Sequence, residues 1–372
     1  MDTKYTSLTL NSRHYTPGDL QDVSENILKS YAAPGWQKKI HLFIQEWLSP
    51  SNLFEITTSG STGSPKMITV TREQMVNSAL RTGGYFGLKP GDKALLCLPV
   101  DFIAGKMMVV RAFVLGLDLV TVHPSSNPLE NTDDRFAFAA MTPMQVYHAL
   151  EGKDGIEKLN RIQKLIIGGG EIDTRLSVLI KALSTGVYQT YGMTETLTHV
   201  AMRRMSGASD IREYNALEGV SFSLDQRGCL VITDAVLGIA GMATNDQVEL
   251  LSETAFRYIG RVDNVINTGG IKVHPEMVES ILQARLGCRI IVAGKKDPVL
   301  GEKVVLVAEL KGCRKPANLK YVIRNAALEK HQLPREVYWL DSFPESSGGK
   351  ILRGKLSEKI GRMSGEALTG TG

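Results

Sequence analysis

Short apolar runs of the kind found in buried strands alternate with helix-like segments through the middle of this chain. The expected strands cover residues 94–98, 119–122, 137–141, 165–167 and 186–190. Helices are expected over residues 103–115, from a start near Thr142-Pro143, and over residues 175–183. Such alternation predicts an α/β region of parallel sheets flanked by helices.

The pattern changes after about residue 215. Short strands expected over residues 220–224, 229–233 and 247–251 are bounded by Gly, Asp or Asn turn signals. Farther along, helices are expected over residues 275–284 and 319–329, with strands at 290–293 and 304–309. The pattern therefore predicts an α+β fold for this second region. Since a single core stops growing at about 250–300 residues, two domains are expected for 372 residues.

Composition narrows the class of protein. A hydrophobic content of 43% with 22% charged residues is ordinary for a globular chain. The net charge of +4 suits anionic substrates, but no dense Lys/Arg block suggests nucleic-acid or lipid binding. The cysteines lack paired metal spacing and are expected to be reduced thiols; they are Cys97, Cys229, Cys288 and Cys313. No signal-like apolar core opens the chain, and no run approaches the ~18 apolar residues of a membrane span, so a cytoplasmic location is expected.

One loop, residues 58–66, contains the candidate phosphate-binding residues. It combines hydroxyl groups and glycines with a terminal cation, Lys66; its other predicted phosphate contacts are Thr58, Ser59, Gly60, Ser61, Thr62 and Gly63. Glycine lets backbone amides approach an anion, hydroxyls donate hydrogen bonds and the lysine adds charge. Pro65 before Lys66 and Met67 after it exclude the Walker type. A Gly/Ser surface turn is the alternative.

Four further segments, together with this loop, resemble the motifs of the adenylate-forming superfamily of acyl-CoA synthetases, peptide-synthetase adenylation domains and luciferases, in the same order. They are residues 191–196 (YGMTET), 243–246 (ATND), 258–273 (YIGRVDN leading into GGIKV) and 347–353 (SGGKILR). Together these segments span residues near 57 to 355. The resemblance implies a large adenylation domain over residues 1–262, made of parallel sheets with helices plus a small distorted barrel. A small mobile α+β domain would follow over residues 263–372, with its hinge at Asp263.

The resemblance also implies a nucleotide site. Asp246 would bind the ribose, Arg261 would contact ribose or phosphate, and Tyr191-Gly192 would lie against adenine. At Asn245 the family usually has glycine. Gly168, Gly169, Gly170 and Glu171 follow an expected strand, where open sheets bind ligands. A tight turn would explain the glycines equally well, core packing would explain Tyr191, and a surface salt bridge would explain Arg261.

The catalytic residues implied by the resemblance are Lys350, Lys66, Thr194 and Glu195. Glu195 would hold Mg²⁺ bridging the ATP phosphates, with a helix N-cap role as the alternative. Lys350 would oppose charge developing on the carboxylate and the α-phosphate. The acid would attack ATP to give an acyl-adenylate and pyrophosphate. The small domain would then rotate, and coenzyme A, passing Gly269 and Gly270, would release AMP. A hairpin turn also explains those two glycines.

Two further segments bear on the identity of the acid. Residues 99–111 and 196–201 resemble the substrate-side segments of o-succinylbenzoate–CoA ligases of menaquinone synthesis, although Asp101 stands where many relatives have histidine. The spectator carboxylate would meet Lys106, Arg111, Thr198 and His199. The competing interpretations are a CoA ligase for another aryl or fatty acid, and a non-catalytic nucleotide sensor. The expected partners are small molecules only, with a homodimer left open.

Overall fold

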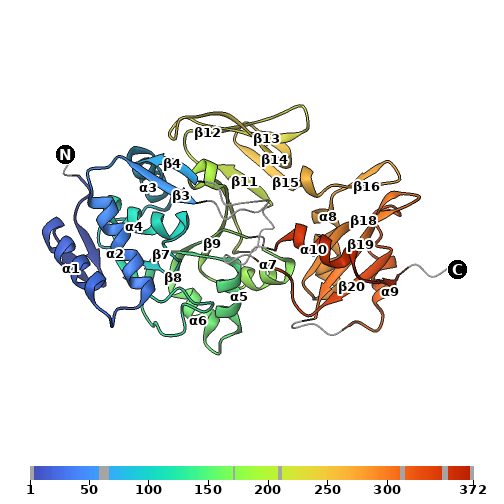
Figure 1. Ribbon diagram of the computed structural model, residues 1–372, viewed down its shortest axis with the longest axis horizontal. Coiled ribbons are helices and arrows are strands. Elements are labelled where there is room, and N and C mark those ends of the chain that lie inside the picture. The colour runs from blue at the N-terminus through green and yellow to red at the C-terminus, as the bar shows by residue number, and fades with distance from the viewer. Residues whose placement is uncertain are drawn as a thin grey trace. The chain divides into compact units, whose positions relative to one another are not determined.

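The computed structural model describes residues 4–57, 67–170, 172–207, 212–310, 315–345 and 351–368 (Figure 1). The chain forms two compact units. The first comprises Met1–Gly170, Leu179–Ser221 and Thr233–Ala240, and the second comprises Glu171–Val178, Phe222–Ile232 and Gly241–Gly372. The expected boundary between residues 262 and 263 lies inside the second unit and stays a prediction.

A largely parallel sheet forms the centre of the first unit. Its strands follow the hydrogen-bonded order β11-β10-β9-β8-β7-β5-β6-β1-β2. Their bounds are β1 Leu8–Leu10, β2 Arg13–Tyr15, β5 Lys93–Leu96, β6 Asp118–Thr121, β7 Phe136–Met141, β8 Ile162–Ile167, β9 Gly186–Gly192, β10 His199–Arg204 and β11 Glu213–Ala216. From β1 through β6, β5, β7 and β8 to β9 every pairing is parallel. The carboxyl ends of these strands therefore share one edge.

Helices accompany this sheet, as the alternation of runs predicted. Their bounds are α1 Pro17–Lys29, α2 Gly35–Leu48, α3 Arg72–Phe86, α4 Ile103–Leu115, α5 Pro143–Glu151 and α6 Gly155–Asn160. Helix α7, Thr174–Lys181, begins in the second unit and ends in the first. Thr16, Thr71 and Thr142 each begin a helix with a reciprocal capping box. Helix α4 ends at Gly116, whose φ of 68° suits glycine. Most of the α4 side chains are buried, which fixes this helix firmly in the unit.

A separate hairpin precedes α3. Strand β3, Leu53–Thr57, pairs antiparallel with β4, Met67–Thr71, and Thr57 lies opposite Met67. The two residues that flank the predicted phosphate loop are therefore neighbours.

The strands that follow β11 are β12 Val220–Leu224, β13 Cys229–Asp234, β14 Ile239–Ser252 and β15 Ala255–Arg261. They are hydrogen-bonded in that order, and β14 pairs antiparallel with β15. The predicted strand over residues 247–251 is thus only part of β14.

The rest of the second unit is α+β. Its sheet has the order β17-β16-β19-β20-β21, with β18 paired to β19. The bounds are β16 Ile266–Thr268, β17 Ile271–Val273, α8 Pro275–Leu286, β18 Ile290–Asp297, β19 Gly301–Glu309, α9 Leu319–Arg324, β20 Glu336–Leu340, α10 Arg353–Gly361 and β21 Glu366–Ala367. Two apolar clusters, one including Val278 of α8 and one including Leu356 of α10, bury residues of its strands.

The α/β and α+β fold class is confirmed. The helix predicted over residues 319–329 is wrong beyond Arg324, because Asn325 donates a side-chain hydrogen bond to the Tyr321 carbonyl and ends α9. Cys97 and Cys229 are buried free thiols, whereas Cys288 is disulfide-bonded, so the expectation of reduced thiols is wrong at Cys288. Within the described ranges, no helix is both long and apolar enough to cross a membrane.

Candidate functional site

The predicted glycines Gly168, Gly169 and Gly170 follow the carboxyl end of β8. A Cβ on Gly168 would lie 2.6 Å from Thr190 Oγ1, and Gly169 has a φ of +79°. Side chains are therefore unfavourable at the first two positions, and the backbone stays open to a ligand above the sheet edge. Glu171 lies outside the described residues.

The turn after β9 holds the next predicted group. A Cβ on Gly192 would lie only 2.4 Å from the Thr198 carbonyl oxygen, so the turn needs glycine there. The Thr196 hydroxyl lies 2.9 and 2.7 Å from the Met193 and Thr198 carbonyl oxygens, which share its one proton, and it accepts from the Met193 N–H at 3.0 Å. Leu197 adopts a φ of 62°, which is unusual for a residue with a branched side chain. A tightly bonded turn therefore fixes this motif.

Within that turn, Thr194 and Glu195 lie in a 3₁₀ segment, Thr194–Thr196, and Glu195 is exposed. No cluster of three His, Cys, Asp or Glu residues that could hold a metal exists in the described part of the chain. Mg²⁺ commonly takes one or two carboxylates and completes its shell with phosphate oxygens and water. An exposed carboxylate such as Glu195 fits that kind of site. The half-buried Tyr191 ring, at the end of β9, lies with its centroid 5.7 Å from that of Tyr214.

The residues that follow this turn, Thr198 and His199, belong to a buried polar cluster in the first unit. His199 begins β10, and its Nε2 lies 3.4 Å from the hydroxyl of Thr82 on α3. One turn of α3 earlier, the Ser78 hydroxyl lies 2.7 Å from that of Thr198. Burial, together with the nearby charges of Arg111 and Arg81, holds the pKa of His199 well below its usual range. His199 is therefore a neutral hydrogen-bonding group at pH 7 rather than a cation.

Arg111 is the most unusual member of this cluster. The residue is 2% exposed, its guanidinium carbon lies 5.8 Å from the Phe138 ring centroid, and its Nη1 donates to the Met108 sulfur at 3.6 Å. Its Nε has no hydrogen-bond partner among the described residues. Burial lowers the pKa of Arg111 to about 10, so the group is still charged at pH 7. A buried charge without an anionic partner is costly.

Arg81, which the sequence did not single out, is buried on α3 beside this cluster. Its Nη1 donates to Asp234 Oδ2 at 2.8 Å, while its Nε and Nη2 have no partner in the described ranges. The other carboxylate oxygen of Asp234 accepts from the Val236 and Leu237 N–H groups. Only the fold brings these groups together, since they are far apart in sequence and follow no motif.

Lys106 and Asp101 are engaged elsewhere. Lys106 Nζ lies 3.4 Å from both Glu46 Oε2 and the Glu55 carbonyl oxygen. Asp101 pairs with Lys39 at 2.9 Å, at the rim of a cavity of about 350 Å³ whose walls include Trp36. The structure therefore gives both residues ionic partners and does not place Lys106 among the described contacts of Arg111 or His199.

The predicted ribose group lies together in the second unit, on β14 and β15. Asp246 is directly opposite Arg261, with Arg261 Nη1 3.4 Å from Asp246 Oδ1 and Nη2 2.9 Å from Asp263 Oδ2. Asn245, which precedes Asp246, donates to both Asp263 carboxylate oxygens at 3.2 Å. The asparagine therefore ties the predicted ribose and hinge residues together.

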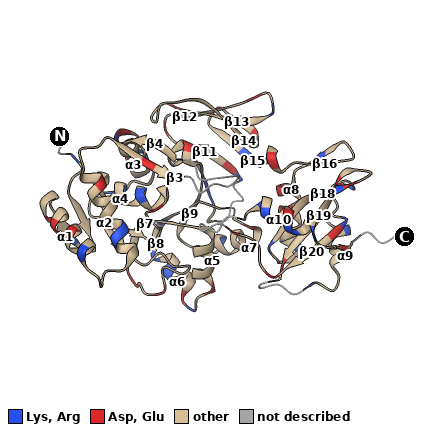
Figure 2. Cartoon of the chain, in the orientation of Figure 1, with Lys and Arg blue, Asp and Glu red and all other residues tan. Residues whose placement is uncertain are grey.

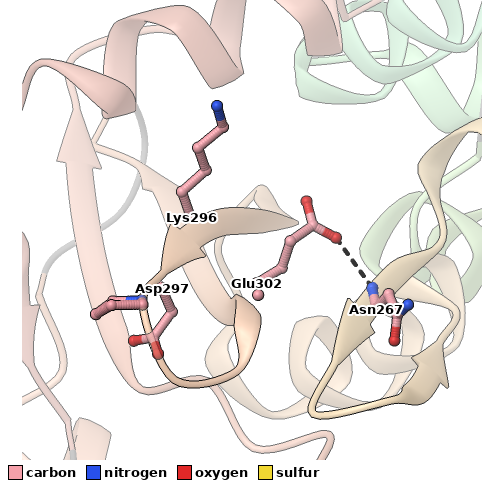
Figure 3. A pocket seen from close by; sticks show the side chains of 6 residues that line it. Asn267, Lys296, Asp297 and Glu302 are labelled. Carbon is pink, nitrogen blue, oxygen red and sulfur yellow. Dashed lines mark hydrogen bonds between the residues drawn. The ribbon is translucent and has the colours of Figure 1, made fainter.

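Gly269 and Gly270 form the turn between β16 and β17, with φ values of +60° and +83°. Positive φ at both positions is what a two-residue hairpin of the I′ type requires. The hairpin interpretation is thus correct for the backbone, and a contact with coenzyme A stays a prediction. A shallow cavity of about 600 Å³ adjoins this hairpin (Figure 3). There the Asn267 N–H donates to Glu302 Oε2 at 3.0 Å, while Lys296 extends away from the other labelled side chains.

The remaining predicted residues lie outside the described parts of the chain. They are Thr58, Ser59, Gly60, Ser61, Thr62, Gly63, Lys66 and Lys350. Along the described ribbon, basic and acidic residues are interspersed (Figure 2).

Comparison with known proteins identifies the class. The family described as "AMP-binding enzyme" matches residues 15–221, more than half of the chain, so the chain belongs to this family. The resemblance to adenylate-forming enzymes is thereby confirmed, as is the prediction of an AMP-forming acid–thiol ligase.

Three similar proteins show which AMP-binding enzymes this chain resembles. A crystal structure of an acyl-CoA synthetase (AMP-forming)/AMP-acid ligase II-like protein from Dyadobacter fermentans is 34% identical, with a TM-score of 0.60 and coverage of 91% of this chain and 98% of the other. A probable 2-succinylbenzoate–CoA ligase from Mycobacterium tuberculosis is 27% identical over 84% of this chain and 85% of its own length. The fold is also that of o-succinylbenzoate coenzyme A synthetase from Bacillus subtilis, solved with ATP and magnesium, at a TM-score of 0.68, 21% identity and coverage of 81% and 69%.

Proposed function

We propose that this ligase joins o-succinylbenzoate to coenzyme A through an acyl-adenylate, using ATP and Mg²⁺, as a step of menaquinone biosynthesis. Curated relatives named 2-succinylbenzoate–CoA ligase support this substrate at 23–27% identity. Residues 99–111 and 196–201, which resemble substrate-side segments, contribute Arg111, Thr198 and His199.

The buried Arg111 guanidinium, which has no carboxylate partner among the described residues, is the observation that carries the proposal. A fold that keeps a charged group 2% exposed without a carboxylate partner among its described residues accepts a cost of several kcal/mol. A substrate anion would remove that cost. o-Succinylbenzoate is a dianion: one carboxylate reacts, and the other must be held without reacting. Arg111 is suited to bind this spectator carboxylate, which benzoate and fatty acids lack.

His199 would complete the recognition as a neutral hydrogen-bond donor. Its lowered pKa keeps it uncharged at pH 7, so the positive charge facing the spectator carboxylate would come from arginine. The adjoining hydroxyls of Thr198 and Ser78, 2.7 Å apart, add further donors. Lys106, already paired with Glu46, would reach the acid only by giving up that pair.

The first half-reaction would proceed by attack of the substrate carboxylate oxygen on the α-phosphorus of ATP. The new bond joins that oxygen to phosphorus, and the bond from the α-phosphorus to the bridging oxygen breaks and releases pyrophosphate. Thr58, Ser59, Gly60, Ser61, Thr62, Gly63 and Lys66 would hold the phosphates, with Glu195 binding Mg²⁺ and Thr194 beside it. Lys350 would stabilise the developing negative charge.

The second half-reaction would transfer the acyl group. The thiolate of coenzyme A attacks the adenylate carbonyl, a carbon–sulfur bond forms, and the carbon–oxygen bond to AMP breaks. Asp246 and Arg261 would hold the ribose, and Tyr191, Gly192 and the segment Gly168, Gly169, Gly170 and Glu171 would hold adenine. Coenzyme A would pass Gly269 and Gly270 after the small domain turns at Asp263. No covalent enzyme intermediate is needed.

Pyrophosphate release with a panel of acids tests this proposal. With ATP, Mg²⁺ and coenzyme A present, o-succinylbenzoate should be turned over at low concentration, while benzoate and decanoate should not. Arg111→Met should remove this preference, and Lys39→Met, in the exposed ion pair with Asp101, is the matched control that should leave it unchanged. Equal turnover of benzoate would indicate that the substrate is another aryl acid. Nucleotide binding without pyrophosphate release would indicate a sensor.

A further inference from the structure

The segment that carries Lys350 begins and ends at neighbouring residues of the second unit. Glu345 and Ile351 face each other in an antiparallel bridge, and the Leu352 N–H donates to the Pro344 carbonyl at 2.8 Å. Residues on both sides of the segment are therefore fixed to each other by the backbone. Each side is also tied into the unit by a buried carboxylate.

On the outgoing side, Arg353 is held by Glu279 of α8. Arg353 Nη1 donates to Glu279 Oε1 at 2.9 Å and Nη2 donates to Oε2 at 2.7 Å. Glu279 Oε1 also accepts from the Val292 N–H at 2.6 Å, and Arg353 Nη1 lies 3.3 Å from the Val292 carbonyl oxygen. Burial raises the pKa of Glu279, and the Arg353 guanidinium opposes that shift. This bidentate pair fixes direction as well as distance.

On the incoming side, Arg289 joins two carboxylates. Its Nη2 donates to Glu345 Oε1 at 2.6 Å and its Nη1 donates to Glu309 Oε2 at 3.0 Å. The other oxygen of the buried Glu309 accepts from the Phe343 N–H at 2.8 Å. Arg289 therefore connects β18, whose first residue directly follows it, to the residues that lead into the Lys350 segment.

Two sets of ionic contacts thus flank the Lys350 segment: the outgoing brace, Glu279–Arg353, and the incoming brace, Glu309–Arg289–Glu345. The outgoing brace holds the first residue of α10, Arg353, and the rest of the helix is attached by apolar packing. Leu356 and Ile360 of α10 are buried in an apolar cluster with Ile291, Val305 and Val307 of the sheet. Apolar packing of this kind is the main source of helix attachment. The braces instead act on Glu345, which directly precedes residues 346–350, and on Arg353, which is three residues after Lys350.

We propose that Glu279–Arg353 and Glu309–Arg289–Glu345 are positioning residues for the adenylation half-reaction, because they fix both ends of the segment from which Lys350 reaches the reacting groups. The inference rests on the proposed function of Lys350. A catalytic group displaced by about 1 Å loses rate by about 10²-fold. The second half-reaction does not use Lys350, so loosening the braces should leave it intact.

Two conservative variants test the outgoing brace. Arg353→Lys keeps the charge but cannot form the bidentate pair, and Glu279→Gln keeps the shape but loses the charge. Adenylate formation, measured by pyrophosphate exchange, should fall about 10²-fold with unchanged KM for ATP and acid. Thioester formation from supplied acyl-adenylate should stay within about 3-fold of the native rate. Lys303→Gln is the control, because it breaks an ion pair with Glu336 between β19 and β20 of the same sheet.

Glu345→Gln tests the incoming brace. Because the Glu345–Arg289 pair is partly exposed, breaking it should cost little folding stability, so this variant should fold even where the buried-pair variants do not. It should show the same selective loss, which the Lys303→Gln control should not. Lys350→Ala, measured in parallel, separates the two proposals. The positioning role is overturned if Lys350→Ala slows only adenylation while the brace variants slow both half-reactions equally or slow neither. If Lys350→Ala itself is not selective, the proposed role of Lys350 fails instead.

Discussion

Replacing Arg111 with methionine should improve stability while destroying substrate preference. The side chain is 2% exposed, so solvent screens its charge little. Each pKa unit corresponds to about 1.36 kcal/mol, and burial lowers the pKa of Arg111 from its ordinary value to about 10. Keeping the guanidinium charged therefore costs about 3 kcal/mol, which the contact with the Phe138 ring offsets only in part.

Methionine fills a similar volume without a charge, so Arg111→Met should raise the free energy of unfolding by about 1–3 kcal/mol in the absence of substrate. The same change removes a charge-assisted contact to the spectator carboxylate, worth about 1.5–3 kcal/mol. The KM for o-succinylbenzoate should therefore rise by about 10- to 150-fold, while turnover of benzoate at high concentration should not fall.

Urea unfolding without ligands and pyrophosphate release with each acid measure these two effects. The Lys39→Met variant, in an exposed ion pair, should change neither by more than about 0.5 kcal/mol. If Arg111→Met lowers the free energy of unfolding and leaves the ratio of the two acids unchanged, Arg111 is a structural residue and the reasoning fails.

Three further predictions follow from the site. Lys350→Ala should abolish adenylate formation but leave thioester formation from supplied acyl-adenylate, and loss of both would refute its assigned role. Gly192→Ala places a Cβ 2.4 Å from the Thr198 carbonyl oxygen, so adenylation should fall at least 10-fold, and an unchanged rate would show that the turn is not needed. Because the pKa of His199 is lowered in the folded chain, the unfolded chain binds more protons below pH ~6.5, and stability should fall there as pH decreases. His199→Gln should flatten that dependence in urea unfolding between pH 5 and 7, and an identical slope would contradict the neutral histidine.

Local patterns predicted much of the large parallel sheet. The helix over residues 103–115 is correct to the residue, because an apolar segment ends at Gly116, a left-handed cap visible in the sequence. The predicted strand over residues 247–251 was too short, since β14 begins at Ile239. Its first part includes Ala240 and Gly241, which are both exposed and carry little strand signal.

The charged part of the site could not be predicted in the same way. Arg111 was proposed from a motif, but its lack of an anionic partner depends on α4 being buried against β7 through Phe138. The neutrality of His199 depends on its burial and then on the charges of two arginines from different helices. Asn245, an expected weakness of the ribose motif, has a partner in Asp263 that β14 and β15 bring near. Each of these facts follows from tertiary packing, which sequence spacing does not encode.

The phosphate bond that the enzyme breaks tests the central claim most directly. ATP labelled at the α-phosphorus should be incubated with the protein, Mg²⁺, coenzyme A and o-succinylbenzoate, and the labelled product separated. Labelled AMP is expected, formed in step with o-succinylbenzoyl-CoA and dependent on the acid. Labelled ADP, or unchanged ATP with every acid tried, would contradict it.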